Sequence, residues 1–391
     1  LHLLSRRQRQ MCIRDSPYTD LTERGTMVIK SLELSNFRNY SLLNLSFDRG
    51  TNILYGDNAQ GKTNILEAIY LCATTKSHKG AKDKDIVNFN EEEAHIRAYL
   101  EKKEDEIRID MHLRKNKSKG IAIDGTRIKK AAELLGIMNV VFFSPEDLSI
   151  IKNGPAERRH FVDMELCQLD AGYLYNLNHY NRIVNQRNRL LKDIYQNPSL
   201  RDTLSVWDDQ MAAFGSQVIE RRITFTEQLN DIIGEIHSRL SGGREHLKVV
   251  YEPDVTSENF AEALHRNQER DIRLKMTSTG PHRDDFSFLA DGVDIRKFGS
   301  QGQQRTAALS LKLSEIELVK KMTKDTPVLL LDDVLSELDS NRQNYLLNSI
   351  GDIQTIITCT GLDDFVNNRF EINKVFRVAN GTVDAGQNGG I

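Results

Sequence analysis

The sequence has few cysteines, no long apolar run and no marked excess of charge of either sign. Its four cysteines, Cys12, Cys72, Cys167 and Cys359, are scattered over 391 residues and form no C-x-x-C pair. This scarcity argues against a disulfide framework or a cysteine-ligated zinc site, and it fits a reducing, cytoplasmic compartment. No window approaches the roughly 18 consecutive apolar residues that a membrane-spanning helix needs.

The formal net charge is −3, with 28% charged and 39% hydrophobic residues. These values are those of an ordinary soluble protein. They do not exclude DNA binding, because a local basic stripe on a neutral body is sufficient. The length allows two domains, or one large domain that carries an insertion.

The first 26 residues are basic and polar, and they lack the apolar core of a signal peptide. Met27 then opens an alternating strand pattern. We expect residues 1–26 to be a non-native or disordered leader, with translation starting at Met27.

The most informative segment that is present reads G-x-x-x-x-G-K-T at residues 56–63. A predicted strand at 52–55 enters it and a predicted helix at 64–71 leaves it. The glycines let backbone N–H groups turn toward phosphates, and the helix N-terminus adds its positive dipole end. Lys62 is expected to reach the β- and γ-phosphates, and the Thr63 hydroxyl to ligate Mg²⁺. The predicted nucleotide-binding residues of this loop are Gly56, Asp57, Asn58, Ala59, Gln60, Gly61, Lys62, Thr63 and Asn64.

Two long helical patterns occupy the middle of the chain. Apolar residues recur every three or four positions from Val162 to Ile194, and again from Leu204 to Leu240. Turn signals at 196–199 and 241–243 end the two runs. They predict two helices of about 40 residues that form an antiparallel hairpin roughly 60 Å long. An ordinary helical domain packed on the core is the alternative.

Nucleotide chemistry resumes beyond these helices. The apolar run 327–331 predicts a buried parallel strand that ends in Asp332 and Asp333. We expect Asp332 to orient Mg²⁺ beside Thr63, and Asp333 to polarise the attacking water. An acidic turn after a strand is weak evidence alone. Together with the phosphate loop it predicts Lys62, Asp332 and Asp333 as catalytic residues.

A second anion-binding helix start is predicted at residues 299–304, where a small, glycine-containing loop carries a hydroxyl group. A chain with one triphosphate site needs only one helix N-terminus that binds phosphate. We therefore expect Ser300, Gly302 and Gln303 to contact the nucleotide of a second copy across a symmetric dimer. A simple helix cap is the alternative.

The order of these motifs resembles the ABC-type ATPase heads of the SMC and double-strand-break repair ATPases. Residues 36–40, 144–148, 154–163 and 279–285 are similar, more specifically, to the RecF family of bacterial recombination mediators. The resemblance implies an α/β fold, an ABC-type ATPase head of mixed β-sheet and helices with an inserted antiparallel helical arm domain. The expected divisions are the leader at 1–26, the first part of the ATPase lobe at 27–155, the arm at 156–243, the second part of the lobe at 244–380 and a flexible tail at 381–391.

The resemblance also implies the function. It implies an ATP- and Mg²⁺-dependent homodimeric clamp on duplex DNA near single-strand gaps, which supports loading of RecA together with RecO and RecR and contributes to the SOS response. It implies that Arg38 contacts the nucleotide. Asp333 stands where many ABC ATPases carry a glutamate, and Thr360 stands in the segment of their switch histidine. Both departures predict slow hydrolysis, and the resemblance implies that DNA stimulates it.

Flexible lysines in polar loops are the candidates for DNA contact, since they suit sequence-independent binding of phosphates. Solvated charged loops explain each cluster equally well. The candidates are Lys76, Lys79, Lys115, Lys117 and Lys119.

Other classes of protein fit less well. An SMC-like chromosome-structure ATPase normally carries arms of hundreds of residues, and a transporter ATPase subunit is not expected to carry the helical arm. No Asn-Lys-x-Asp motif indicates a GTP switch. A structural DNA binder with an inactive ATPase stays open.

Overall fold

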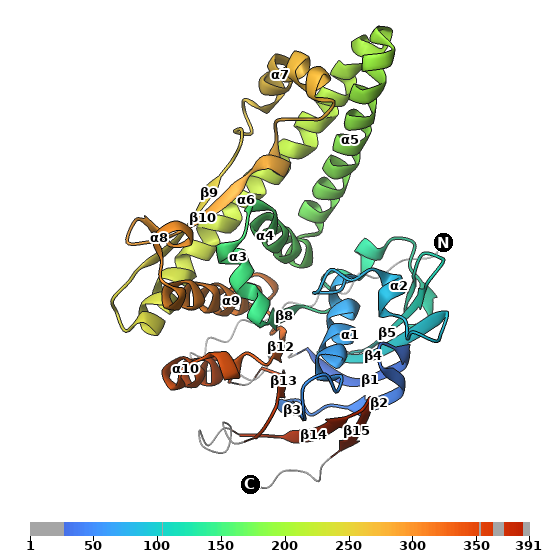
Figure 1. Cartoon of the computed structure of the whole chain (residues 1–391), viewed down its shortest axis with the longest axis vertical. Helices are drawn as coiled ribbons and strands as arrows, with labels where there is room; N and C mark the ends of the chain where they lie inside the picture. The colour runs from blue at the N-terminus through green and yellow to red at the C-terminus, as the bar shows by residue number, and fades with distance from the viewer. Residues whose placement is uncertain (1–26, 104, 352, 363–370, 386–391) are drawn as a thin grey trace, which may run out of the picture.

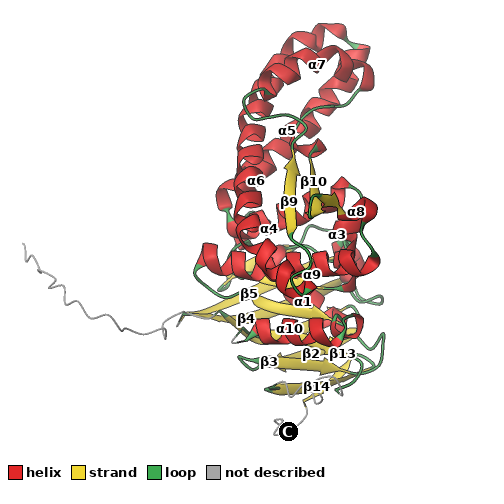
Figure 2. Cartoon of the chain, turned by 90° about the vertical axis from the view of Figure 1, so that its left-hand side faces the viewer, coloured by secondary structure: helices red, strands yellow, loops and turns green. Residues whose placement is uncertain are grey.

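The computed structural model describes residues 27–385 except 104, 352 and 363–370 (Figure 1). The predicted leader and residues 386–391 of the predicted tail lie outside the described residues. Strands gather at the base of the molecule, and helices extend from it as an arm (Figure 2). Within the described part of the chain, no helix has both the length and the apolar character needed to cross a membrane.

The first sheet is antiparallel, with strand order β2-β1-β4-β5-β6-β7. Its alternating pattern, as at the buried residues Ala94, Ile96, Ala98 and Leu100, turns one face toward the core and leaves the other open. The alternating strand pattern predicted to open at Met27 is confirmed in β1. The strands are β1 (Val28–Phe37), β2 (Tyr40–Ser46), β4 (Glu93–Lys102), β5 (Asp105–Arg114), β6 (Gly120–Ile123) and β7 (Thr126–Arg127).

The second sheet is mixed and has the order β15-β14-β3-β13-β12-β8. Its strands are parallel except for β15, which runs against β14. The predicted parallel strand before Asp333 is confirmed, and the apolar run 140–143 forms a buried strand beside it. The strands are β3 (Thr51–Tyr55), β8 (Val140–Phe143), β12 (Val328–Asp332), β13 (Thr355–Cys359), β14 (Lys374–Ala379) and β15 (Thr382–Ala385).

Helices and the first sheet bury both faces of this second sheet, as its nearly continuous apolar strands require. Leu330 packs in the core that contains α1 (Lys62–Thr74) and the antiparallel sheet. Its neighbour Leu331 packs in the core that contains α9 (Gln301–Thr323) and α10 (Ser340–Ile350). Successive residues therefore face opposite layers, and even-numbered positions of β12 look toward α1.

The arm is built on α5 (Ala171–Gln196) and α6 (Leu204–Ser241), which lie side by side (Figure 1). The second long helix was predicted correctly, but the first was not. It is divided into α4 (Pro155–Leu169) and α5, because the Asp170 side chain accepts hydrogen bonds from the N–H groups of Gly172 and Tyr173 and starts a new helix. Asp170-Ala171-Gly172 is a sequence signal that could have located this break.

A small sheet follows the arm helices and packs on them. Its strands are β9 (Leu247–Glu252), β10 (Asp285–Ala290) and β11 (Val293–Asp294), in the order β11-β10-β9. Val249 and Phe288 share a core with Phe225 and Leu229 of α6. We propose that the arm domain extends past residue 243 to include this sheet, α7 (Phe260–Leu274) and α8 (Ile295–Phe298).

Short elements complete the described chain. They are α2 (Asp83–Ile86), α3 (Leu148–Lys152) and the 3-10 helices Ala131–Leu134, Pro145–Asp147, Pro198–Thr203, Pro281–Arg283 and Leu335–Glu337.

A buried ionic network fixes the root of the arm. Arg222 of α6 is 2% exposed and donates to Asp163 and Asp284, each at 2.8 Å. Arg158 donates to both carboxylate oxygens of Asp285, at 2.7 and 3.0 Å. Residues 154–163 and 279–285, two segments that carry the family resemblance, thus contact each other. Removing one partner of such a buried pair costs about 3–5 kcal/mol.

Candidate nucleotide-binding site

The phosphate loop connects the C-terminal end of β3 to α1, and its backbone requires glycine at both ends. Gly56 has φ +151° and Gly61 has φ +114°. A Cβ on Gly61 would lie 2.6 Å from Asn39 Nδ2 and 2.7 Å from the Tyr40 hydroxyl. A Cβ on Gly56 would lie 2.3 Å from the Val378 carbonyl oxygen. The loop therefore closes tightly against β14 and the turn between β1 and β2.

Lys62 curls back over this loop. Its Nζ donates to the carbonyl oxygens of Gly56 at 2.6 Å and Asp57 at 2.8 Å. Burial lowers the pKa of Lys62, and the nearby charge of Asp333 opposes that shift. The first N–H groups of a helix have no partner within the helix, so the start of α1 offers backbone donors beside this ammonium group.

Thr63, Asp332 and Thr358 form one hydrogen-bonded cluster at the C-terminal edge of the parallel strands. The hydroxyls of Thr63 and Thr358 both donate to Asp332 Oδ1, each at 2.8 Å. Asp332 and Thr358 are register partners on β12 and β13, and both project toward α1. A threonine hydroxyl beside a carboxylate is a hard-oxygen pair of the kind that Mg²⁺ prefers. The cluster therefore fits the predicted metal site.

Asp333 follows directly and holds an unusual backbone conformation. Its φ is +52°, and its N–H donates to the Thr358 hydroxyl at 3.0 Å. A non-glycine residue in the left-handed region carries strain, and such residues cluster at functional sites. The kink turns Asp333 out of the strand beside Lys62, whose charge it influences.

Asparagine and glutamine side chains brace the loop from outside. Asn39 Nδ2 donates to the Gln60 carbonyl at 2.9 Å, and Asn64 Nδ2 donates to Asn39 Oδ1 at 2.8 Å. Gln60 Oε1 accepts from the Asn380 N–H at 2.6 Å. The loop thus has fixed partners at both flanks.

Arg38 is held by Glu67 of α1. Its Nε and Nη2 each donate to the Glu67 carboxylate at 2.8 Å, and its Nη1 donates to the Asp85 carbonyl. Burial raises the pKa of Glu67, but hydrogen bonds from Arg38 and Ser77 outweigh it and bring the pKa below its usual value. The nucleotide contact expected for Arg38 stays a prediction.

The second helix start lies elsewhere on the molecule. Ser300 and Gln303 cap α9 reciprocally, with the Gln303 N–H donating to Ser300 Oγ at 3.2 Å and the Ser300 N–H to Gln303 Oε1 at 2.8 Å. Ser300 and Gly302 are exposed. α8, which leads into this loop, and α1 lie on opposite sides of the view in Figure 1. Within one chain the structure therefore does not bring the two predicted phosphate-binding segments together.

The lysines predicted to contact DNA divide into two groups. Lys76, Lys79 and Lys117 are exposed. Lys115 donates to the Phe89 carbonyl, and Lys119 donates to Asp83 at 2.9 Å and to the Thr75 carbonyl. Their role in binding stays a prediction, with Lys119 the least available of the five.

Three residues of the site escaped prediction. Thr358 shares Asp332 with Thr63, Glu67 holds Arg38, and Asn39 supports the loop. Thr358 ends the β-branched run 355–358, and a hydroxyl one residue before the end of β13 was the available signal.

Comparisons with known proteins agree with this geometry. The family model for the RecF/RecN/SMC N-terminal domain matches residues 28–384. The chain is 65% identical over 358 residues to the DNA replication and repair protein RecF of Agathobacter rectalis, covering 92% of this chain and 99% of that protein. It is 63% identical to the protein of the same name from Lachnoclostridium phytofermentans, covering 92% of this chain and all of that protein.

Solved structures give the same result. A structure described as the recombination mediator protein RecF with ATP, in the RecFOR pathway, has a TM-score of 0.88 and 35% identity, covering 94% of this chain and all of that one. An SMC head domain from Pyrococcus furiosus, at 17% identity and a TM-score of 0.54 over 92% of this chain and 96% of that one, shares the fold. The predicted α/β ABC-type ATPase head is thereby confirmed, and the chain belongs to the RecF family.

Proposed function

We propose that this chain is an ATP-gated recombination mediator in DNA replication and repair. Two copies close around two triphosphates and grip duplex DNA near single-strand gaps. The observation that carries the proposal is the separation of the two helix starts, one tightly braced around Lys62 and the other exposed at Ser300. In the dimer, the start of α1 in one copy faces the start of α9 in the other copy, and the two together form one nucleotide site.

The surroundings of Ser300 support this arrangement. Phe298 precedes the loop and is 75% exposed. A Cβ built on Gly302 would meet only the Ser300 hydroxyl, at 3.9 Å, so the space above the loop is open. An open, capped helix start beside an exposed aromatic ring suits contact with a partner's phosphates.

Residues of one chain prepare the hydrolytic step. Lys62 and the backbone of the loop hold the phosphates, and Asp333 is positioned to orient a water molecule. Mg²⁺, when bound at Thr63 and Asp332, would neutralise charge that develops on the phosphates. The short Asp333 side chain favours slow turnover, which suits a switch that releases DNA.

The partners follow from the family. We propose that RecR and RecO act with the closed dimer to load RecA next to a gap. The solved relative described as belonging to the RecFOR pathway supports this assignment. Exposed lysines, including Lys117, would contact DNA phosphates without reading sequence.

Complementation tests the shared site. Lys62→Arg damages the first helix start and Ser300→Arg obstructs the second, so each homodimer lacks two working sites. A mixed dimer keeps one intact site, formed by Lys62 of one copy and Ser300 of the other. We expect each variant alone to fail in ATP-dependent dimerisation by sedimentation and in turnover, and the mixture to regain up to about half of wild-type turnover per mixed dimer.

A matched control and a contrary result complete the design. Ser205→Arg places the same side chain on the exposed start of α6 and should leave dimerisation and turnover unchanged. If Ser300→Arg dimerises and hydrolyses ATP normally, or if the mixture gains nothing, the shared-site model is wrong. If the dimer forms without hydrolysis, the chain is a structural DNA binder.

A further inference from the structure

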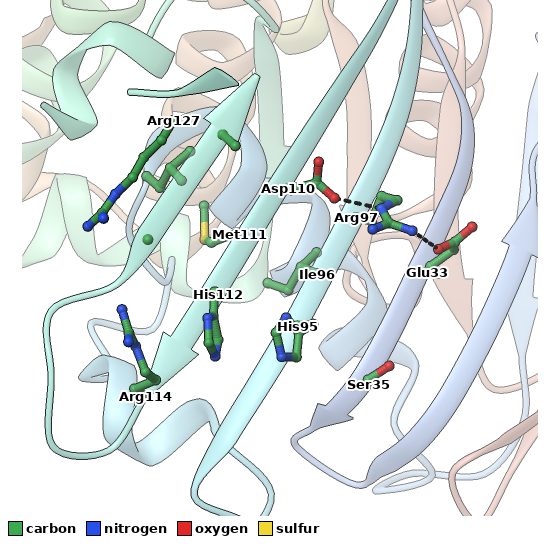
Figure 3. Close-up of a pocket in the computed structure, with 13 residues that line it drawn as sticks. Glu33, Ser35, His95, Ile96, Arg97, Asp110, Met111, His112, Arg114 and Arg127 are labelled. Carbon is green, nitrogen blue, oxygen red and sulfur yellow. Dashed lines mark hydrogen bonds and ion pairs between the residues drawn. The ribbon is translucent and has the colours of Figure 1, made fainter. Parts of the chain in front are cut away.

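A second cluster of ligand-type side chains lies on the open face of the antiparallel sheet, the face turned away from the core that contains α1. His95 of β4 and His112 of β5 are register partners, so their Cα positions are set by the sheet. Their rings stack with centroids 4.1 Å apart and planes inclined by 20° (Figure 3). Glu93, two residues before His95, projects from the same face because side chains alternate along a strand.

Both imidazoles face the same carboxylate. Glu93 Oε2 lies 2.8 Å from His112 Nε2, and Glu93 Oε1 lies 3.9 Å from His95 Nε2. One donor atom from each residue falls within 4.8 Å of the other two. Protein ligands sit about 2.0–2.2 Å from Zn²⁺, so small side-chain rotations would bring all three onto one ion.

We propose that Glu93, His95 and His112 form a binding site for a divalent transition-metal ion, of which Zn²⁺ is the most suitable. Two imidazole nitrogens and one carboxylate oxygen are borderline ligands that suit Zn²⁺, Co²⁺ or Cu²⁺ better than Mg²⁺. Because the backbone positions are held by strand pairing, metal binding needs little reorganisation of the chain.

The surroundings leave room for further ligands. The cluster borders a pocket of about 580 Å³ on the open sheet face, in which His95 and His112 are lining residues. Water would fill the remaining coordination positions, as it does where a protein supplies only three zinc ligands. The three ligands are partly exposed, so an ion can reach them.

Arginines slightly outnumber carboxylates around the cluster, but several of them are held in ion pairs, including Arg97 and Arg108, which share Asp110. Arg97 is paired with Asp110 at 2.6 Å and with Glu33 at 3.2 Å (Figure 3). Arg114 and Arg127 also line the pocket, and they are the positive groups that oppose metal binding. Glu93 is the register partner of Arg114 and offsets its charge.

Metal titration of the full-length protein tests the site. After treatment with a chelator and with Mg²⁺ present, Co²⁺ is titrated while visible absorption is followed, and Zn²⁺ binding is measured by calorimetry. We expect one Co²⁺ ion to bind per chain and to be displaced by Zn²⁺. The spectrum of the bound Co²⁺ should lack the thiolate-to-cobalt charge-transfer band that cysteine ligands would produce. His112→Asn and Glu93→Gln should each weaken Zn²⁺ binding by at least about 10- to 100-fold.

His265→Asn is the matched control, since it removes an exposed histidine of α7. It should leave the affinity unchanged. Thermal unfolding of each variant without metal checks that the sheet is intact, and Zn²⁺ should raise the Tm of the wild type but not of His112→Asn. Absence of saturable binding by the wild type, or equal binding by the double variant His95→Asn/His112→Asn, would overturn the proposal.

Discussion

The two helix starts of this chain carry similar local chemistry but differ in how they are completed. The start of α1 is braced on every side, with Asn39, Asn380 and Val378 fixing the loop and Asp332 beside Thr63. The start of α9 has its own cap and an open surface. A site that binds its ligand within one chain needs such bracing, whereas a site that meets a ligand on another copy must stay exposed.

The largest effect is expected from substitution of Lys62, because this change alone should abolish nucleotide binding at the start of α1. Lys62→Ala should weaken ATP binding and lower turnover by at least about 100-fold, since it removes the ammonium group that we propose to hold the phosphates. Calorimetry with ATP and a turnover assay measure the two quantities. Lys248→Ala, at an exposed lysine of β9, is the control. Normal ATP binding by Lys62→Ala would contradict the assignment of the start of α1 as the site that binds ATP within one chain.

Glu67 tests how far bracing stabilises the first start. Glu67→Gln should lower the free energy of unfolding by about 2 kcal/mol at neutral pH, because it weakens hydrogen bonds from the charged Arg38. The pKa of Glu67 is lowered in the folded state. Its stabilisation is therefore present above its unfolded pKa of about 4.3 and is lost as the pH falls through the folded value.

Chemical denaturation at several pH values measures this effect, and the difference between wild type and Glu67→Gln should shrink in acid. Glu106→Gln, at an exposed partner of Lys30, should change stability little at any pH. If the stability difference between wild type and Glu67→Gln grows in acid, ionised Glu67 does not stabilise the fold through Arg38.

Two threonines of β13, Thr358 and Thr355, allow an effect on stability to be distinguished from an effect on turnover. Thr358→Val removes the hydroxyl that donates to the Asp332 carboxylate and accepts from the Asp333 N–H. Turnover should fall about tenfold, because the Asp332 carboxylate and the Asp333 backbone lose this support. Thr355→Val removes a buried hydroxyl of the same strand, which donates to the Ile353 carbonyl at 2.9 Å. Both variants should lose about 1 kcal/mol of stability. Only Thr358→Val should lose activity in the turnover assay, and equal activity of the two variants would exclude a role for Thr358.

The smallest effect is expected at the cap of the second start. Ser300→Ala should destabilise the protein by about 1 kcal/mol and leave ATP binding to the monomer unchanged, because the loop around Lys62 does not depend on Ser300. Thermal unfolding and calorimetry at low protein concentration measure these properties. Asp170→Ala, which removes the cap of α5 and an ion pair with Arg221, should cost more stability and yet spare the ATP-dependent dimer. Loss of ATP binding by monomeric Ser300→Ala would show that the starts are not independent.

Local patterns were sufficient for much of the fold. The alternating strands, the buried strand before Asp332 and the long helix α6 all follow from periodicity in the sequence. The break at Asp170 was missed because apolar spacing continues across it, and only the capping geometry reveals it. The packing of the small sheet after residue 243 on α6, on which we base its proposed assignment to the arm, depends on contacts between distant segments and could not be read from local patterns.

The sequence by itself determined the phosphate loop, the Asp332–Asp333 pair and the cap at Ser300, because each depends on spacing within a few residues. Only the tertiary structure decided which residues meet across the chain. Thr63 and Asp332 are 269 positions apart, and the parallel register of β12 and β13 adds Thr358 to them. The same reason explains why His95 and His112 attracted no attention in the sequence: strand pairing, which no local pattern encodes, places their imidazoles side by side.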